Sequence, residues 1–519
     1  MSEQKPQYIL AIDNGTQSIR ALLFDVKGEL VAKSKVDLVA YYSDKPGWAE
    51  QDANYFWQKL GQACQQLWAQ DGIEPKSVMA VTLTTQRDTV VNVNKQGSPL
   101  RPAIIWLDQR LSENNKPMPW YWRLAFTLVG QAKAVNYFRR KAKSNWLAQH
   151  QPGIWQNTHK FLLLSGFLTH KLTGEFKDSV AATVGYLPFS YRDLSWANKL
   201  DWKWQAIPVT QNMLPDLVEP GCELGTITEQ AHKATGIPVG LKLIAAASDK
   251  ACEVLGSGCI SPNVASLSYG TTATVNTNNK KYVEPLPFIP PFPSAIPKQY
   301  NSEVMIYRGF WMVSWFKHQF GQREMEQAKT LGVTPESLFD ELVEQVPPGS
   351  MGLMLQPYWS PGIQNLEAKG AILGFGDVHT RAHIYRAILE GLAYALREGK
   401  EKLEKRQKVK IERLVVSGGG SQSDAAMQLT ADIFNLPASR PHTFETSGLG
   451  AAMNAAVGLG VYKDYTDARD HMTRTKDTFE PNPENVALYQ QLYSQVYLKM
   501  YRQLKPIYQT IKQITGYPK

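Results

Sequence analysis

Cysteine is scarce in this chain: its 519 residues include four, Cys64, Cys222, Cys252 and Cys259. No two of them form a Cys-x-x-Cys pair, and Cys252 and Cys259 lie too far apart for the usual zinc-knuckle spacing. The pattern excludes a disulfide-dense scaffold and argues against a zinc site. We therefore interpret the four as free thiols in a reducing compartment.

Long apolar runs are also lacking. A membrane-spanning helix needs about 20 consecutive, mostly apolar residues, and no run in this sequence approaches that length. The first residues, MSEQKPQYILAID, do not follow the basic-then-apolar order of a secretory signal. We expect a cytoplasmic protein without a transmembrane segment.

Neither sign of charge dominates: 56 Lys and Arg stand against 47 Asp and Glu, a formal net charge of +9. Proteins that bind nucleic acid usually gather their basic residues in a patch or an arm. Here the excess is spread along the chain, so nucleic acid is not an expected partner. Two interpretations of the excess stay open, a phosphate-bearing small ligand and a basic surface without further meaning.

The composition is that of a globular protein, with 43% hydrophobic residues, 20% charged residues and a length that suits two to four domains. A strand–turn–strand pattern with a Gly-Thr turn occurs twice, around Gly15 and around Gly270, which indicates two similar domains with a boundary near 256–263. The first pattern lies in a predicted meander of strands at 8–12, 19–24 and 30–35. Further strands are predicted at 78–83, 90–93, 243–246, 264–268, 273–276 and 414–416. Helices are predicted at 54–70, 380–405 and 485–514, the last with a kink or break at Pro506.

Residues 113–145 interleave aromatic and basic side chains, among them Trp120, Trp122, Arg139 and Lys143. Such a stretch is typical of a helix that docks on a membrane surface or a partner. It is more often typical of an amphipathic helical subdomain that packs on its own protein. We favour the second interpretation, and both stay open.

Three glycine-containing turns follow predicted buried strands: Gly15-Thr16, Gly270-Thr271-Thr272 and Gly418–Ser421. Glycine lets backbone N–H groups approach an anion closely, and threonine hydroxyls add donors. Asp13 and Asp249 also stand at strand ends. One carboxylate beside phosphates can hold Mg²⁺, and a second can accept the proton of an attacking hydroxyl. The chain has no Gly-x4-Gly-Lys-Ser/Thr motif, so a Walker-type loop is not expected.

These motifs, in this order, resemble those of the FGGY family of carbohydrate kinases, within the actin-like ATPase superfamily. The likeness runs from Asp13 to about Tyr462, and Phe375 is a mild departure from it, because an aliphatic residue is usual there. The segments that carry the likeness are Asp13–Arg20, Trp106–Arg110, Leu172–Glu175, Ser248-Asp249 with Gly256–Gly258, Tyr269–Thr272, Gly370–Glu390, Gly418–Ser421 with Gln428, Ala431 and Asp432, and Gly448–Ala452.

The resemblance implies an α/β fold in which two ribonuclease-H-like domains flank a deep active-site cleft. Residues 1–258 then form the mainly sugar-binding domain, and residues 259–519 the mainly ATP-binding domain. The implied activity is ATP-dependent phosphorylation of a hydroxyl of a small carbohydrate, with ATP and Mg²⁺ required.

The resemblance also implies roles for single residues. Asp249 is expected to be the general base, and Asp13 is expected to position Mg²⁺. For Arg20, a contact to phosphate and a structural ion pair both stay open. The residues expected to bind the nucleotide are Thr16, Gln17, Arg20, Gly270, Thr271, Thr272, Gly419, Gly420 and Ser423.

The segment Gln86–Thr89 resembles the acceptor loop of glycerol kinase with Asp in place of Glu. Arg87 and Asp88 are then expected to grip vicinal hydroxyls, and a plain surface ion pair between them is the alternative. Trp106 and Asp108 are expected to shape the acceptor site. Segment 113–145 does not resemble glycerol kinase, so we expect an acceptor larger than glycerol, such as a ketose, a polyol or a sugar acid.

Lys250 follows the expected base at a position where Asn or Gln is common in relatives. It is expected either to contact the acceptor and lower the pKa of Asp249, or to point away.

Two alternatives to an active kinase stay open. A catalytically silent ATP-binding regulator on the same scaffold is one, and the presence of both Asp13 and Asp249 argues against it. A peripheral membrane or nucleic-acid binder that uses residues 113–145 is the other, and it requires salt-dependent binding to an anionic surface. Relatives are often dimers or tetramers, so a homo-oligomer is compatible with the resemblance.

Overall fold

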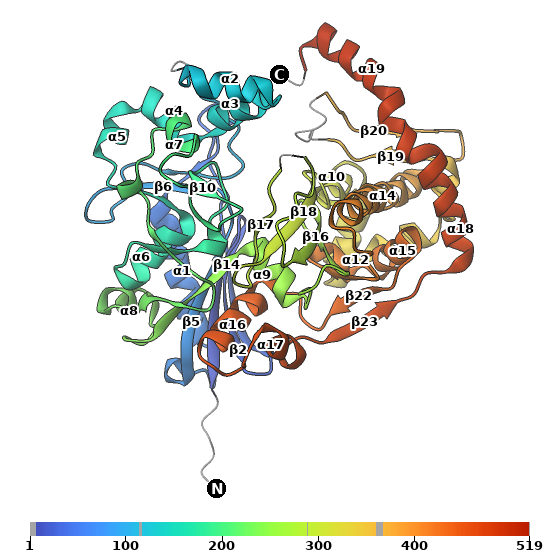
Figure 1. Cartoon of the computed structure of the whole chain (residues 1–519). Coiled ribbons are helices and arrows are strands. Elements are labelled where there is room, and N and C mark those ends of the chain that lie inside the picture. The colour runs from blue at the N-terminus through green and yellow to red at the C-terminus, as the bar shows by residue number, and fades with distance from the viewer. Residues whose placement is uncertain (1–6, 114–116, 288, 360–366, 518–519) are drawn as a thin grey trace.

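Two β-sheets of the same topology form the cores of two domains in the computed structural model, which describes residues 7–113, 117–287, 289–359 and 367–517 (Figure 1). The strands of the first sheet, in the order β13-β14-β5-β1-β2-β3, are β1 (Tyr8–Asn14), β2 (Ser18–Asp25), β3 (Leu30–Asp37), β5 (Val78–Thr85), β13 (Glu223–Thr226) and β14 (Lys242–Ser248). The strands of the second sheet, in the order β17-β18-β16-β15-β21-β22-β23, are β15 (Val264–Tyr269), β16 (Ala273–Asn279), β17 (Phe292–Pro293), β18 (Tyr300–Ile306), β21 (Arg413–Ser417), β22 (Ala438–Pro441) and β23 (Thr475–Phe479).

Each sheet begins with an antiparallel meander, β1-β2-β3 in the first and β15-β16-β18 in the second. Two strands then run parallel to the first strand of the meander, β5 and β14 in one sheet and β21 and β22 in the other. An antiparallel edge strand, β13 or β23, ends each sheet on one side. The two-residue strand β17, at the other edge of the second sheet, has no counterpart in the first. The predicted internal repeat and the expected pair of ribonuclease-H-like domains are therefore confirmed.

Successive side chains of β1 point to opposite faces of the first sheet, and a helix covers each face. Leu10 and Ile12 pack with the apolar side of α1 (Ala53–Trp68), whereas Ile9 and Ala11 point to the opposite face and pack with α16 (Thr446–Gly458). Because both faces are covered, β1 is buried almost throughout, as strands in the parallel part of such a sheet usually are. The second sheet is covered on one face by the long helix α14 (Arg381–Gln407).

The remaining elements decorate these two cores. Small sheets contain β4 (Glu50–Gln51), β6 (Val90–Val93), β7 (Ala103–Ile104), β8 (Lys160–Leu163), β9 (Lys177–Ser179), β10 (Phe189–Ser190), β11 (Ser195–Trp196), β12 (Asp216–Val218), β19 (Met354–Gln356) and β20 (Ala371–Leu373). The helices not yet named are α2 (Trp120–Leu128), α3 (Ala132–Lys141), α4 (Lys143–His150), α5 (Pro152–Asn157), α6 (Leu164–Thr173), α7 (Lys203–Ala206), α8 (Glu229–Thr235), α9 (Asp249–Gly256), α10 (Trp311–Phe320), α11 (Gln322–Leu331), α12 (Pro335–Leu338), α13 (Asp340–Glu344), α15 (Asp424–Phe434), α17 (Tyr465–Met472), α18 (Pro483–Gln491) and α19 (Leu498–Thr515).

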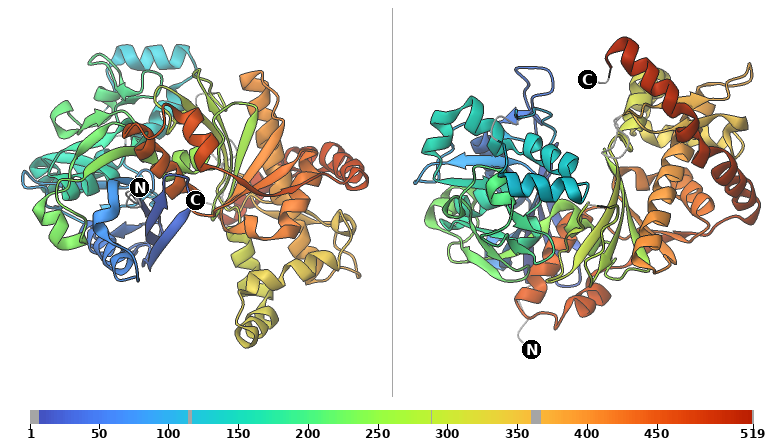
Figure 2. Two further views of the ribbon diagram at one scale, coloured as in Figure 1. Left: turned by 90° about the horizontal axis from the view of Figure 1, so that it is seen from below. Right: turned by 45° about the horizontal axis from the view of Figure 1, so that its top comes forward.

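Two helices cross at the junction of the domains. Helix α9 follows β14 of the first sheet but contacts strands of the second, and α16 follows β22 of the second sheet but packs on the first. Figures 1 and 2 show α16 and α17, coloured orange-red, beside the blue strands of the first sheet. Glycine makes this crossing close, because a Cβ on Gly450 of α16 would overlap the carbonyl oxygen of Cys252 in α9.

Segment 113–145 forms short helices, within α2 to α4, that pack on the same protein. Trp122, Phe126 and Phe138 lie against a core that includes Trp146 and Leu147, and residues 114–116 lie outside the described part. The interpretation as an intramolecular subdomain is therefore confirmed. The outer face of α2 still carries exposed apolar side chains, including Trp120 and Leu128.

The C-terminal helices correct one expectation. Helix α18 leads through a π-helical turn, Leu492–Tyr497, into α19, and α19 continues through Pro506. Of the predicted kink or break at Pro506, the break is wrong, because the helix continues through the proline. Residues on both sides of Pro506 are solvent-exposed, so water can satisfy the carbonyl group that the missing N–H leaves without a partner. Figure 2 shows this helix along the outside of the second domain.

The four cysteines are free thiols, as predicted. In the described part of the chain, no helix is both long and apolar enough to cross a bilayer.

Candidate active site between the two sheets

The ends of three strands bring the predicted acidic residues together. Strands β1, β5 and β14 run parallel, so their carboxyl ends share one edge of the first sheet. Asp13 lies near the end of β1, and Asp249 follows β14 as the first residue of α9. The predicted acceptor loop, Gln86–Thr89, begins directly after β5. The edge therefore gathers residues from three distant parts of the sequence.

Asp13 is buried and carries a positive neighbour. The Arg20 guanidinium donates to its carboxylate at 2.9 Å, and the Nε of Arg20 lies 3.6 Å from Glu445. Burial raises the pKa of Asp13 to about 6, while the charge of Arg20 opposes this shift and the charges of Asp249 and Glu445 add to it. The structural ion pair expected as one role of Arg20 is therefore present.

Asp249 is the first residue of α9, and it is close enough to Arg87 of the predicted acceptor loop for that charge to act on its carboxylate. Burial raises its pKa, and the positive charges of Lys250 and Arg87 pull the pKa down. Lys250 thus lowers the pKa in the expected direction, but burial outweighs it. A half-buried carboxylate with a raised pKa is a stronger proton acceptor than an exposed one.

The acceptor loop is held from two sides. Arg87 forms an ion pair with Glu303 of β18 at 3.1 Å, and its guanidinium lies 4.9 Å from the ring centre of Phe292. Asp88 has a positive φ of 50° and forms an ion pair with Lys143 of α4 at 2.8 Å. Arg87 and Asp88 thus engage other charged groups, rather than each other as the surface-pair alternative expected.

The Trp106 segment reaches the first phosphate motif through hydrogen bonds. The indole N–H of Trp106 donates to the Thr16 hydroxyl at 2.9 Å, and that hydroxyl donates to the Gln86 side chain at 3.2 Å. The side chain of Asp108 is only 1% exposed, and it accepts hydrogen bonds from Arg110 and from the Ala49 N–H. Asp108 therefore supports the segment from inside.

Gln17, within the predicted first phosphate motif (Asp13–Arg20), is solvent-exposed and lies in the turn between β1 and β2. Its carbonyl accepts a hydrogen bond from the Leu38 N–H at 2.8 Å, which ties the turn to the end of β3.

The second sheet presents its glycine turns at the ends of β15 and β21. Gly270, Thr271 and Thr272 connect β15 to β16, with Thr271 exposed and Thr272 buried. Gly418 has a φ of 85°, and a Cβ there would lie 2.9 Å from the backbone of Tyr269, so the two turns touch.

The third glycine motif leads into helix α15. Gly419 and Gly420 form a short 3-10 turn, and a Cβ on Gly420 would overlap the ring of Phe310. Ser423 caps α15 by accepting from the Ala426 N–H, and it donates to Asp340 at 2.6 Å.

Sequence reasoning missed several residues at this site, and four of them bind the predicted acceptor loop or Lys250. Glu303 and Lys143 form ion pairs with Arg87 and Asp88 of the predicted acceptor loop. Both lie in segments without a kinase sequence motif. Glu253 and Ser268 bind the Lys250 side chain, each at 2.7 Å. A sequence signal existed for Glu253, because a Lys and a Glu three residues apart on a helix face each other.

The acidic residues fit a magnesium ion on a nucleotide. In the described ranges, no group of three or more His, Cys, Asp or Glu is arranged for a metal on its own. Mg²⁺ on a nucleotide needs only one or two carboxylates, since phosphates and water supply the other ligands. Asp13 fits such a site. It lies at the same strand edge as Asp249, and the negative charge of Asp249 acts on its carboxylate.

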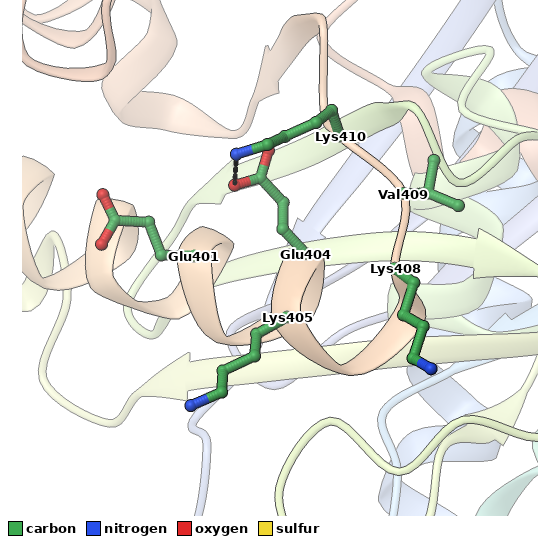
Figure 3. Close-up of a pocket in the computed structure, with 6 residues that line it drawn as sticks. All are labelled: Glu401, Glu404, Lys405, Lys408, Val409 and Lys410. Atoms are coloured by element: carbon green, nitrogen blue, oxygen red, sulfur yellow. Dashed lines mark ion pairs between the residues drawn. The ribbon is translucent and has the colours of Figure 1, made fainter.

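Two surface pockets lie away from these motifs. One of about 370 Å³ is lined by the last turns of α14 and the following segment, where Lys410 lies 4.0 Å from Glu404 (Figure 3). The other, of about 820 Å³, lies where the linker at 260–262 meets the start of α17. Neither pocket is lined by a predicted site residue.

Comparison with known proteins agrees with this geometry. Two family models match, the N-terminal domain of the FGGY family of carbohydrate kinases over residues 8–256 and its C-terminal domain over residues 265–459. The chain is 32% identical over 487 residues to the uncharacterized sugar kinase YgcE of Escherichia coli K12, covering 93% of this chain and 91% of that protein. It is 28% identical over 510 residues to the xylulose kinase of Lactococcus lactis, covering 96% and 97%.

A solved structure shows the same fold. The gluconate kinase from Lactobacillus acidophilus superposes with a TM-score of 0.81 at 22% identity, covering 97% of this chain and 99% of that chain. Both family models match in order, and the motif residues lie at the strand ends of the two sheets. The chain therefore belongs to the FGGY family of carbohydrate kinases, ATP-dependent enzymes that phosphorylate an alcohol group of a small carbohydrate.

Proposed function

We propose that Asp249 is the general base of this kinase. The acceptor hydroxyl loses its proton to the Asp249 carboxylate as its oxygen attacks the γ-phosphorus of ATP, and ADP leaves. The observation that carries the proposal is the place of Asp249 at the strand edge, where the charge of Arg87 acts on its carboxylate and its own charge acts on Asp13. The raised pKa of Asp249 brings its proton affinity closer to working pH, which favours proton transfer.

The nucleotide side is assigned to the glycine turns. Asp13 would hold Mg²⁺, which neutralises charge on the phosphates when bound. In the phosphate turns, backbone N–H groups and hydroxyls donate to the β- and γ-phosphates, and Gly419, Gly420 and Ser423 line the adenosine side. The residues assigned to the phosphates are Thr16, Gln17, Arg20, Gly270, Thr271 and Thr272. The Thr16 hydroxyl now donates to Gln86, so binding a phosphate oxygen requires it to exchange partners.

The acceptor side is assigned to Arg87, Asp88 and Trp106. Asp108 supports Trp106 through the backbone, and Lys250 has one N–H left for an acceptor beyond those given to Glu253 and Ser268. Because Arg87 pairs with Glu303 and Asp88 pairs with Lys143, these four residues carry no net charge. The balance favours a neutral ketose or polyol larger than glycerol over a sugar acid.

The test is ADP release from Mg-ATP over a panel of acceptors: glycerol, xylulose and other ketoses, polyols and gluconate. One acceptor should stimulate release strongly, and Asp249→Ala should lower kcat by about 10²–10⁴-fold, the range for loss of a general base. Asp71→Ala, at an exposed aspartate, is the matched control and should behave as wild type. Full activity in Asp249→Ala would remove the proposed base. ATP binding without stimulation by any acceptor would favour the silent regulator.

A further inference from the structure

Lys250 belongs to a buried network that reaches into the second domain. Its Nζ donates to Glu253 at 2.7 Å and to the Ser268 hydroxyl at 2.7 Å. The Ser417 hydroxyl donates to the other oxygen of Glu253, also at 2.7 Å. The Lys250 side chain is 20% exposed and that of Glu253 only 7%. We refer to these four residues as the Lys250 network.

The two serines place the network beneath the nucleotide turns. Ser268 and Ser417 are register partners on the adjacent parallel strands β15 and β21, so their side chains point to the same face of the second sheet. Ser268 stands one residue before Tyr269 and two before Gly270 of the phosphate turn. Ser417 stands directly before Gly418 of the adenosine turn. One ion pair therefore contacts the roots of both turns.

Charge holds the network together. Burial lowers the pKa of Lys250, but the negative charges of Glu253 and Asp249 outweigh it and leave the pKa raised. Burial raises the pKa of Glu253, and Lys250 with the serine hydroxyls outweighs it and leaves the pKa lowered. Both groups are therefore charged at neutral pH. A buried ion pair adds little net stability compared with apolar residues, but it fixes geometry strongly, because loss of one partner leaves an uncompensated charge.

The network acts at the residue next to the proposed base. Asp249 and Lys250 are the first two residues of α9, which the chain enters from β14 of the first sheet. The charge of Arg87 on the acceptor loop reaches the Asp249 carboxylate, whereas Lys250 is bonded to the second sheet. Adjacent residues therefore join the acceptor side to the nucleotide side.

We propose that the Lys250 network fastens the start of α9, and with it Asp249, to the nucleotide-binding sheet. The base then keeps its place relative to the γ-phosphate when the domains move, and the acceptor is brought to it. Lys250, Glu253, Ser268 and Ser417 are positioning residues in this scheme. The proposal rests on the proposed role of Asp249 as base.

The kinetic test neutralises the pair without leaving a lone charge. In Lys250→Gln/Glu253→Gln, kcat should fall by about 10²-fold, the loss expected from a shift of about 1 Å at the reacting atoms. The KM for Mg-ATP should stay within about threefold of wild type, because the groups assigned to the nucleotide are untouched. Any rise in the acceptor KM from loss of the one remaining Lys250 N–H should be small beside the fall in kcat. An unchanged kcat overturns the proposal. A raised acceptor KM with unchanged kcat also overturns it, since Lys250 would then be an acceptor ligand.

A matched control separates positioning from general damage. Lys400 and Glu404 form a comparable pair on α14, at 3.1 Å with side chains 12% and 8% exposed. Lys400→Gln/Glu404→Gln should keep the wild-type kcat per folded molecule. If the Lys250 double variant does not fold, Ser268→Ala/Ser417→Ala removes only the hydroxyl anchors, and its kcat should fall by about tenfold at unchanged KM. Wild-type kcat in that variant overturns the proposal.

A second readout does not depend on turnover. ADP binding should slow backbone hydrogen exchange in residues 249–256 of the wild type, because α9 is fastened to the sheet that binds ADP. The protection should be lost in Lys250→Gln/Glu253→Gln and kept in the α14 control. If ADP does not slow hydrogen exchange in residues 249–256 of the wild type, the proposal for the Lys250 network is overturned. This measurement stands even if Asp249→Ala keeps its activity, so failure of the proposed base is distinguished from failure of the network.

Discussion

Arg87 and Glu303 are 216 positions apart and belong to different domains, yet their side chains form an ion pair at 3.1 Å. The Arg87 side chain is 14% exposed and that of Glu303 only 3%. Arg87 of the first domain, which we propose binds the acceptor, is therefore held by the sheet of the second domain. A change in the relative placement of the domains would be transmitted to its guanidinium group.

We predict that Glu303→Gln weakens acceptor binding. The substitution keeps the shape of the side chain and removes the charge that orients Arg87, so the acceptor KM should rise by about tenfold, equivalent to about 1.4 kcal/mol. The KM for Mg-ATP should change little. Steady-state kinetics with the best acceptor measures both.

The control for Glu303→Gln is an exposed ion pair that also joins distant segments. Glu29 and Arg474 lie 2.5 Å apart with side chains 59% and 39% exposed, and exposed pairs of this kind contribute little. Glu29→Gln should leave both KM values unchanged. A normal acceptor KM in Glu303→Gln would show that Arg87 keeps its orientation without its partner.

Lys143 gives the aromatic–basic segment a role at the site. Its ammonium group pairs with the Asp88 carboxylate at 2.8 Å and also donates to the Asp88 carbonyl group. These contacts hold Asp88 in a left-handed backbone conformation, which is unfavourable for residues other than glycine. Lys143→Met should therefore raise the acceptor KM by about tenfold or more.

Lys133→Met provides the comparison for that prediction, because Lys133 lies in the same segment but is exposed. It should leave the acceptor KM at the wild-type value. Equal effects of the two substitutions would mean that the positive charge of the segment matters and the contact with Asp88 does not.

Local patterns predicted the strands well, and the limits of prediction lie in long-range packing. The apolar runs at 8–12 and 19–24 with Gly15 between them specify the first hairpin, because strand and turn signals are local. Nothing near 446–458 indicates that α16 packs on β1, more than 400 positions earlier. That contact depends on the path of the whole chain.

In the candidate site, too, local sequence signals and long-range contacts differ in how well they could be predicted. The positions of Asp13, Asp249 and the glycine turns at strand ends were predictable, since each stands in a local motif. Glu303 reaches Arg87 only because β18 extends the second sheet toward the acceptor loop. A single glutamate in a strand carries no sequence signal for such a contact, so its role required the fold.

Asp178 makes stability depend on pH. It is 2% exposed and accepts hydrogen bonds from the Ser165 hydroxyl and the Ser179 N–H. Burial raises its pKa from 3.8 to about 7, against the effect of these bonds. The folded state thus binds the proton more tightly than the unfolded state. The protonated Asp178 carboxyl therefore contributes fully to the free energy of unfolding below about pH 4. This contribution falls as the pH rises through about 7, and the total loss is about 4 kcal/mol.

Asp178→Asn, which resembles the protonated carboxyl, should therefore raise Tm strongly relative to wild type at pH 8 and have little effect at pH 4, where the carboxyl is protonated in the folded state and close to its ordinary pKa in the unfolded state. Thermal unfolding at the two pH values measures the difference. Asp216→Asn is the control, because Asp216 is an exposed carboxylate on the neighbouring strand β12. The same shift in Tm at both pH values for Asp178→Asn would contradict the prediction.

The contact between α9 and α16 links stability to the position of Asp249. Gly256 and Gly450 bring the two backbones together, and the Ser447 hydroxyl donates to the Asp249 carbonyl group at 3.2 Å. A methyl group at position 450 would overlap the carbonyl oxygen of Cys252, so the helices must move apart. Overpacking of this kind costs about 1–3 kcal/mol. The helix propensity of alanine offsets at most about 1 kcal/mol of that.

Gly450→Ala should therefore lower both Tm and kcat, because the displaced helix carries the proposed base. Gly153→Ala tests the helix effect alone: Gly153 lies in α5, and a Cβ there meets no atom within 4 Å. Its Tm should equal or slightly exceed that of wild type, with unchanged kcat. If Gly450→Ala lowers Tm while kcat per folded molecule stays at the wild-type value, the crossing supports the fold without setting the position of Asp249, and the base is held by the second sheet alone.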